Sequence, residues 1–414
     1  MSAEDRLAEV IRLEGARLQA TLVRSLGDWS LAEDAVQEAV LAALRDWTVR
    51  GIPEHPQAWL ITTARRKAID LIRRERARDG KEQAGAELME LTRSEQPAGT
   101  VLDDDLLRLI FTCCHPSLAP DARLALALRT LCQLSVAQVA AAMLTTEAAM
   151  AKRLTRIRQK ITVAKIPYRV PADSDLPERL TAVCGVVHAL YTAGHAPVGG
   201  DSVLDVDLCA EGLRLARLLN RLLPDEAMPA AVLALVLLTE ARRPARVEKQ
   251  GDPVPLSVQD RSRWDRSMIE EGSGLLQAGL RRTQGIADPY QLQAAIAYEH
   301  DRAASYAATD WTEILRLYDL LLSVAPSAPA ALGRAVVLAE LDGPEAGLAA
   351  LATLPVDTRR EAVRSELLAR AGRPAEAAAA VSAALSGEAP EAQQRYWRQR
   401  LAAWEDDAAR ASRP

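Results

Sequence analysis

The sequence predicts an all-α chain with more than one domain, and three observations support this. Its 414 residues exceed the roughly 250 to 300 at which a single hydrophobic core stops growing. Hydrophobic residues make up 49% and charged residues 26%, the balance of an ordinary globular protein. Aromatic residues make up only 4%, with Phe111 the single Phe. The core must therefore be built from Ala, Leu and Val, which suits helix-on-helix packing.

Apolar periodicity predicts the first three helices over residues 3–26, 30–48 and 56–78. In the second of these, Val36 and Val40 face the predicted core. The opposite, exposed side gathers Asp34, Gln37 and Glu38. Taken alone, such a polar face is more typical of a solvated surface than of a docking site.

The third predicted helix combines an apolar stripe with many basic residues. The stripe consists of Leu60, Ala64, Ala68 and Leu71. Residues 63–81 hold eight basic and three acidic side chains. A basic helix with an aromatic residue near its start can bind a DNA strand and stack an unpaired base.

Residues 79–101 interrupt the helical pattern and are predicted to form a flexible linker. The stretch contains Asp79-Gly80 and Pro97-Ala98-Gly99 and shows no apolar stripe. After it, periodicity predicts helices near residues 103–113, 119–132, 135–143 and 146–164. Pro167 and Pro171 then mark a boundary.

The last two of these helices form the strongest local pattern, a predicted helix-turn-helix. Ser135 is suited to cap the first, and residues 144–146 form the break between them. In the second helix a predicted buried stripe comprises Met150, Leu154, Ile157 and Ile161. Beside it lies an exposed stripe of Ala149, Arg153, Arg156 and Lys160. Such a stripe suits the DNA major groove, where Arg pairs with guanine and phosphates; the alternative is a solvated basic helix face.

From about residue 172 the chain is Ala- and Leu-rich helix interrupted by loops at residues 194–207 and 244–255. Residues 335–346 resemble residues 366–377, and the glycines of the two stretches, Gly343 and Gly372, lie 29 residues apart. This repeat favours tetratricopeptide-like helical hairpins, clearest over residues 310–414. Residues 1–169 carry a net charge of +3 and residues 170–414 one of −8. The basic excess lies in 63–81 and 148–169, which suggests contact with phosphates.

The sequence favours neither a metal centre nor an enzyme. Cys113-Cys114-His115 suggests a metal site, but neighbouring helical side chains diverge and no CxxC or HxxxH pair lies nearby, so buried structural thiols are favoured. There is no Gly-rich phosphate loop, and no cofactor is expected. The chain begins without a signal-peptide pattern, and its longest apolar run, residues 230–238, is too short to span a bilayer. A cytoplasmic, non-enzymatic protein is expected.

Taken in this order, the segments over residues 5–165 resemble bacterial sigma factors of the extracytoplasmic-function class. The resemblance implies four parts: a region 2 domain over 1–78, a linker over 79–101, a region 4 helix-turn-helix domain over 102–168, and a helical extension over 169–414. It implies binding to RNA polymerase core, through its β′ and β subunits, and to promoter DNA. Residues 31–44 are similar to region 2.2, which docks on the β′ coiled coil. Polymerase binding would then fall to Asp34, Gln37 and Glu38.

The same resemblance assigns DNA contacts to two helices. Residues 56–74 are similar to regions 2.3 and 2.4, which melt and read the minus-ten element; the matching residues are Trp59, Arg65, Arg66, Lys67, Asp70, Arg73 and Arg74. The helix-turn-helix is similar to region 4.2, which reads the minus-thirty-five element; the residues implied are Ala149, Lys152, Arg153, Arg156, Arg158 and Lys160. The chain has Arg66 where the family commonly has Asn, and Ala151 where it commonly has Lys. The promoter sequence that family members recognise therefore cannot be assigned to this chain.

The long extension resembles that of a sigma-factor subgroup with tetratricopeptide-like C-terminal arrays. Residues 111–116, 207–211, 260–265 and 290–295 are similar to stretches of that subgroup, and an ion-paired helix start is the favoured interpretation of residues 260–265. Subgroup members often occur in operons with small proteins of a DGPF-type family, which are therefore possible partners. The main alternative is a one-component regulator with a helical sensor domain. That alternative leaves residues 30–78 without a role.

Overall fold

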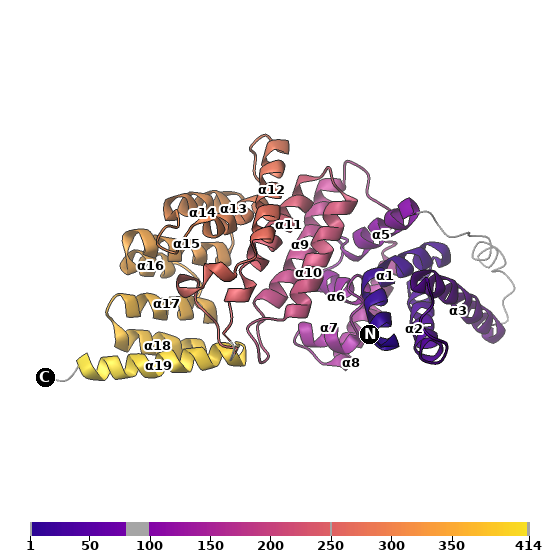
Figure 1. Cartoon of the computed structure of the whole chain (residues 1–414), viewed down its shortest axis with the longest axis horizontal. Coiled ribbons are helices and arrows are strands. Elements are labelled where there is room, and N and C mark those ends of the chain that lie inside the picture. The colour runs from indigo at the N-terminus through magenta and orange to yellow at the C-terminus, as the bar shows by residue number, and fades with distance from the viewer. Residues whose placement is uncertain (1, 80–98, 249–250, 412–414) are drawn as a thin grey trace. The chain divides into compact units, whose positions relative to one another are not determined.

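The computed structural model describes residues 2–79, 99–248 and 251–411, and the regular elements in these ranges are helices (Figure 1). A single isolated bridge joins Val247 and Pro253. The all-α prediction is confirmed. Contacts divide the chain into two compact units, unit 1 over residues 1–186 and unit 2 over residues 187–414. Residues 80–98 of the predicted linker lie outside the described residues. The described parts of the predicted linker, Asp79 and residues 99–101, are helical.

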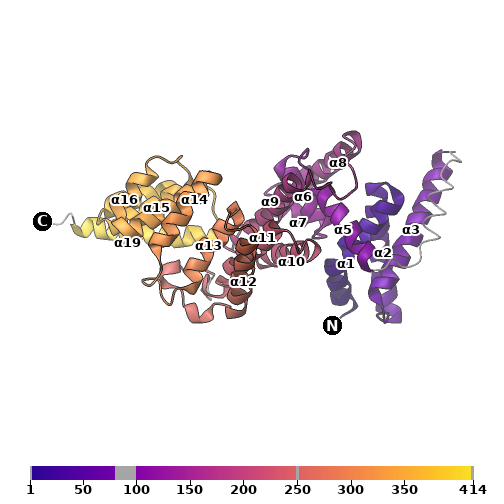
Figure 2. The ribbon, with the colours of Figure 1, turned by 90° about the horizontal axis from the view of Figure 1, so that it is seen from above.

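Unit 1 begins with a bundle of three helices, α1 (Ala3–Leu26), α2 (Trp29–Arg50) and α3 (Pro56–Asp79), and Figure 2 shows α3 alongside α2. Ser2 caps α1 in a reciprocal capping box. Gly27 ends the helix at φ 65°, a left-handed conformation that favours glycine. Asp28 then caps α2 by accepting a hydrogen bond from the Leu31 backbone. Both ends of α1 and the start of α2 are therefore set by local sequence signals.

The core of this bundle is lined with alanine, which lets the helix backbones approach closely. Ala32, Ala35, Ala39 and Ala43 of α2 are fully buried. On α3 the buried stripe is Leu60, Ala64, Ala68 and Ile72, whereas Leu71 is only partly buried. The prediction of Leu71 as the last core residue was therefore wrong by one position. Repeated four-residue spacing keeps the stripe on one side of this helix.

The second half of unit 1 contains α5 (Gly99–Cys113), α6 (Pro120–Thr130), α7 (Val136–Ala142) and α8 (Glu147–Val163). Ser135 forms a capping box with Gln138 at the start of α7, and Thr146 caps α8 by accepting from the Ala149 backbone at 3.2 Å. Met150, Leu154, Ile157 and Ile161 are all buried. The helix-turn-helix and its buried stripe are confirmed.

The five cysteines are buried, as the interpretation of structural thiols predicts. Burial raises the pKa of Cys114 to about 12, so the thiol stays protonated at neutral pH. Among the described residues, no group of His, Cys, Asp and Glu could hold a metal ion. No helix in the described part of the chain is long and apolar enough to cross a membrane.

The boundary between the two units falls within α9 (Leu176–His195). Arg179, in the unit 1 part of this helix, is buried and donates to the Phe111 carbonyl at 2.5 Å. The division is thus later in the chain than the predicted domain boundary at residue 169. A fragment that ends before α9 would lose this contact.

Unit 2 continues as a succession of helices with short 3₁₀ turns. Its helices are α10 (Val206–Leu222), α11 (Ala227–Glu240), α12 (Arg266–Arg282), α13 (Pro289–Arg302), α14 (Trp311–Val324), α15 (Ala328–Asp342), α16 (Pro344–Leu351), α17 (Thr358–Arg370), α18 (Pro374–Leu385) and α19 (Glu391–Ala411). The 3₁₀ turns are η1 (Arg243–Ala245), η2 (Leu256–Val258) and η3 (Arg261–Arg263).

The repeat found in the sequence corresponds to two helical hairpins, α15–α16 and α17–α18. Gly343 and Gly372 make the turns with φ of 89° and 72°, and a proline begins the second helix of each hairpin. Figure 1 shows α17, α18 and α19 side by side, and helices adjacent in sequence pack on one another throughout the stack. An ion pair between Glu340 and Arg370, at 2.5 Å, links one hairpin to the next. The predicted helical hairpins are confirmed.

Residues 260–265 have a structural role that differs in detail from the prediction. Asp265 caps α12 by accepting from the Met268 backbone at 3.1 Å, so a helix does start here. Arg261, however, donates to the carbonyls of His300 and Ala303, and its guanidinium lies 4.5 Å from the ring centre of Trp264. Carbonyls and an aromatic face, rather than the neighbouring carboxylates, hold this arginine.

Two half-buried histidines, His195 and His300, should make the stability of unit 2 depend on pH. Burial, reinforced by nearby arginines, lowers the pKa of His195 to about 2 and that of His300 to about 3. Below about pH 6.5 the unfolded chain protonates these rings while the folded chain does not, so the free energy of unfolding falls as pH falls. Asp301 opposes this between about pH 4 and 7, because burial raises its pKa to about 7 and the folded state keeps the extra proton.

We therefore expect His195→Gln to reduce the loss of stability between pH 7 and pH 5. Each such histidine contributes up to about 1.4 kcal/mol per pH unit to that loss. The measurement is urea unfolding of the full chain at both pH values. His55→Gln, at an exposed histidine in unit 1, is the control. An equal loss in wild type and His195→Gln would contradict the expectation.

Candidate polymerase and promoter interface

The acidic face of α2 is exposed where the sequence predicts polymerase binding. Asp34 and Gln37 are exposed, whereas Val36 beside them is buried. Partial burial, followed by the negative charge of Glu33, raises the pKa of Asp34 from its ordinary value. Concentrated negative charge on one helix face suits a partner that carries basic side chains.

Glu38, the third predicted polymerase contact, meets a residue predicted to contact DNA. Its carboxylate lies 3.6 Å from the Lys67 ammonium of α3, and both side chains are partly exposed. The pair joins the faces of α2 and α3 by an interaction of the kind that contributes less than about 1 kcal/mol at a surface. Both groups remain available to larger partners.

Some residues on the basic face of α3 pack against the rest of the helical bundle. Trp59 is half-buried and packs edge-to-face on Trp47, with ring centres 5.7 Å apart. Burial, followed by the positive charge of Arg24, lowers the pKa of Arg65. The remaining predicted DNA contacts on this helix, Arg66, Asp70, Arg73 and Arg74, are exposed. The predicted minus-ten residues thus lie on one helix, and four of them are exposed.

On α8 the predicted DNA contacts fall into two groups. Ala149, Lys152, Arg156 and Lys160 are exposed, and Arg153 is partly exposed beside Asp121 at 3.4 Å. Arg158 instead turns toward α2, where its guanidinium pairs with Glu33 and its side chain is only 20% exposed. The structure thus places Arg158 apart from the exposed stripe, and its contact with DNA stays a prediction.

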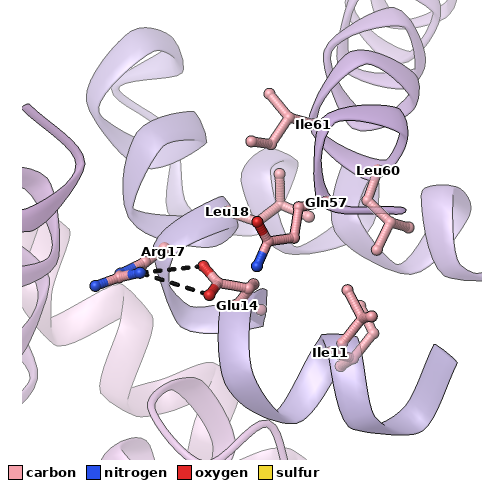
Figure 3. A pocket seen from close by; sticks show the side chains of 9 residues that line it. Ile11, Glu14, Arg17, Leu18, Gln57, Leu60 and Ile61 are labelled. Atoms are coloured by element: carbon pink, nitrogen blue, oxygen red, sulfur yellow. Dashed lines mark hydrogen bonds and ion pairs between the residues drawn. The ribbon is translucent and has the colours of Figure 1, made fainter. Parts of the chain in front are cut away.

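Two hollows of unit 1 are lined by residues other than these. One, of about 50 Å³, lies between α1 and α3 and is lined by Ile11, Leu18 and Leu60, with the Glu14–Arg17 pair nearby (Figure 3). Such a volume is far below the roughly 300 to 1,000 Å³ of ligand pockets. A second hollow, of about 390 Å³, opens beside it near Arg6 and His55. None of the predicted site residues lines either hollow.

Comparison with known families accounts for most of unit 1 and the start of unit 2. Residues 10–78 match the model of sigma-70 region 2, and residues 108–161 match that of sigma-70 region 4. Residues 179–280 match a family of unknown function, DUF6596. An uncharacterized protein from Rhizobium meliloti (strain 1021) is 38% identical over 389 residues, which cover 91% of each chain. No solved structure matches.

A helical bundle with a basic third helix, followed by a helix-turn-helix, defines a transcription factor that recognises promoter DNA. The region 2 match precedes the region 4 match along the chain, as in sigma-70 proteins. The chain belongs to the sigma-70 family and is an extracytoplasmic-function sigma factor with a helical C-terminal extension. It is a non-enzymatic initiation factor that works with RNA polymerase core and promoter DNA.

Sequence reasoning missed the contacts between the region 2 and region 4 parts of unit 1. Glu33 of α2 pairs with Arg129 of α6 as well as with Arg158. Tyr168, which follows α8, donates to the Ala20 carbonyl of α1 at 2.8 Å. The residues involved are far apart in sequence and lie on no common periodic pattern. No signal in the sequence marks them as partners.

Proposed function

We propose that the exposed face of α2 docks on the β′ subunit of the polymerase core, that α3 melts and reads the minus-ten element, and that α8 reads the minus-thirty-five element. Support comes from accessibility: Asp34, Gln37, Arg66 and Arg156 all reach solvent from helices whose other faces are buried. We also include the β subunit as a contact of region 4, and place the protein in the cytoplasm with the polymerase.

Run-off transcription with purified core polymerase tests this proposal most directly. A sigma factor confers initiation at a defined start site, whereas a one-component regulator binds duplex DNA without doing so. Defined transcripts that appear only with core and this protein would support the proposal. Binding to duplex DNA without any transcript from a panel of candidate promoters would favour the regulator.

The exposed stripe of α8 predicts different roles for two arginines. We expect Arg153→Ala to cost about 1 to 3 kcal/mol at the matching promoter and to relax specificity there, because a paired base loses its partner. Arg156→Ala should weaken all promoters alike, because it removes a phosphate contact. A promoter-variant panel makes the comparison, with Arg169→Ala as a control at an exposed basic residue outside α8. Equal, sequence-independent losses for both arginines would contradict base recognition by Arg153.

We further propose that unit 2 modulates activity through protein contacts. Residues 187–414 carry a net charge of −6, and like charges repel DNA phosphates, so this part does not add promoter affinity electrostatically. The partner of unit 2 in this proposal is the polymerase, the sigma domains or a small DGPF-type protein. The helical hairpins, which stack as in tetratricopeptide-like arrays, suit such protein contacts.

A further inference from the structure

The first turn of α6 places a carboxylate beside one of the two arginines on the exposed stripe of α8. Asp121 is the second residue of α6, and its Oδ2 lies 3.4 Å from NH2 of Arg153. The Asp121 side chain is 75% exposed and that of Arg153 is 35% exposed, so the pair lies at the surface. An exposed pair of this kind contributes little to folding stability. Its place beside residues predicted to read DNA suits a role in recognition.

The backbone that carries Asp121 is firmly held. Arg123, in the same turn, donates from Nε to the Leu118 carbonyl at 2.8 Å and from NH2 to the Pro116 carbonyl at 3.0 Å. These bonds fix the chain where it enters α6. Residues 125–128 of α6 are buried, and α6 packs on α8. Because an aspartate side chain is short, a fixed backbone confines its carboxylate, so α6 presents a fixed negative charge to α8.

Arg156, the other arginine of the stripe, is held differently. It is exposed, and its Nε donates to the Lys152 carbonyl of its own helix at 3.4 Å. A contact with phosphate carries no sequence information, whereas recognition of guanine requires a guanidinium that lies in the plane of the base and meets both N7 and O6. Orientation by a neighbouring helix therefore matters for a base-reading arginine such as Arg153, and much less for Arg156.

We propose that Asp121 is a positioning residue for base recognition: its carboxylate holds one side of the Arg153 guanidinium so that the other side meets a guanine in the major groove. The proposal rests on the proposed function, because it takes α8 as the helix that reads the minus-thirty-five element. A guanidinium has five N–H donors, and a guanine occupies two of them. A carboxylate on the remaining side orders the side chain before DNA arrives, so less conformational entropy is lost on binding.

Selection from a promoter library tests the positioning role on the full chain bound to core polymerase. Both promoter elements are randomised in templates that each carry a transcribed barcode, so sequencing of the transcripts gives the base preference at every position. We expect Arg153→Ala to abolish a guanine preference at one position of the minus-thirty-five element. Asp121→Asn should weaken the same preference about two- to tenfold, the effect of releasing one long side chain, and leave the other positions unchanged.

Three further variants separate positioning from other roles of Asp121. In the Arg153→Ala background, Asp121→Asn should change nothing further at that position, because a positioning residue acts only through the residue that it holds. Asp121→Glu keeps the charge and should restore part of the preference. Asp104→Asn, at an exposed carboxylate on α5, removes the same charge and should leave the preference as in wild type.

The outcomes separate the positioning role from the proposed function. If Arg153→Ala loses the guanine preference and Asp121→Asn keeps it in full, the positioning role alone is overturned. A change at a neighbouring position in Asp121→Asn would show that the carboxylate contacts a base itself, such as the amino group of cytosine, and would also overturn positioning. The absence of any position-specific loss in Arg153→Ala would overturn base reading by Arg153 and the positioning role with it.

Thermal unfolding distinguishes a purely structural role of the carboxylate. Asp121 lies in the first turn of α6, where a negative charge favours the positive end of the helix dipole. If this were its only role, Asp121→Asn would lower the melting temperature and reduce transcription from all library members alike, which would overturn the proposal. We expect a melting temperature close to that of wild type, together with the loss at one position.

Discussion

Replacement of both Asp34 and Glu38 by Lys is expected to weaken association with polymerase core at least tenfold, which is about 1.4 kcal/mol of binding free energy. Two negative charges on the exposed face of α2 become positive, so attraction to a basic partner turns into repulsion. The fold should persist, because neither side chain is buried and surface charges contribute little to stability. A pull-down titration with purified core measures the affinity.

The double reversal needs a control for its secondary effect on α3. Glu38→Lys also removes the pair with Lys67, so the single Lys67→Glu variant, which breaks the same pair, should be titrated in parallel. Glu4→Lys with Glu9→Lys on α1 provides the same change in net charge away from the predicted face. If core affinity is the same for the α2 double variant and the α1 double variant, α2 is not the docking helix.

Removal of unit 2 is expected to lower transcription several-fold without changing the start sites. An acidic array can support the sigma domains by packing but not by binding phosphates, so its loss should affect activity rather than promoter choice. The cut belongs after Val186, since Arg179 in the first part of α9 is anchored to the Phe111 carbonyl and a cut at Pro171 would remove that anchor.

Run-off transcription by the shortened chain makes the test, after circular dichroism has shown that residues 1–186 keep their helical content and unfold cooperatively. Full activity from the folded fragment would contradict a supporting role, and higher activity would indicate that unit 2 masks the sigma domains. A different set of start sites would contradict the division of labour between the two units.

The helices of unit 1 and their caps could be predicted from the sequence because the signals that define them are local. Ser135 and Thr146 lie next to the helices they cap, and Met150, Leu154 and Ile157 repeat with the helical period. An apolar stripe shows which face of a helix is buried, so the exposure of Arg156 and Lys160 followed from the same pattern. Family resemblance then supplied the roles of these faces.

Only the tertiary structure decided which charged residues face one another. Glu33 meets Arg129 and Arg158, whose positions in the chain are about a hundred residues away, and Tyr168 reaches the backbone of Ala20. Periodicity places Arg153 in the exposed stripe of α8, and the family resemblance adds Arg158. In the structure Arg153 is partly exposed, whereas Arg158 turns toward Glu33. The difference depends on how whole helices dock, because a contact between distant segments is set by the summed packing of both surfaces and has no local pattern in the chain.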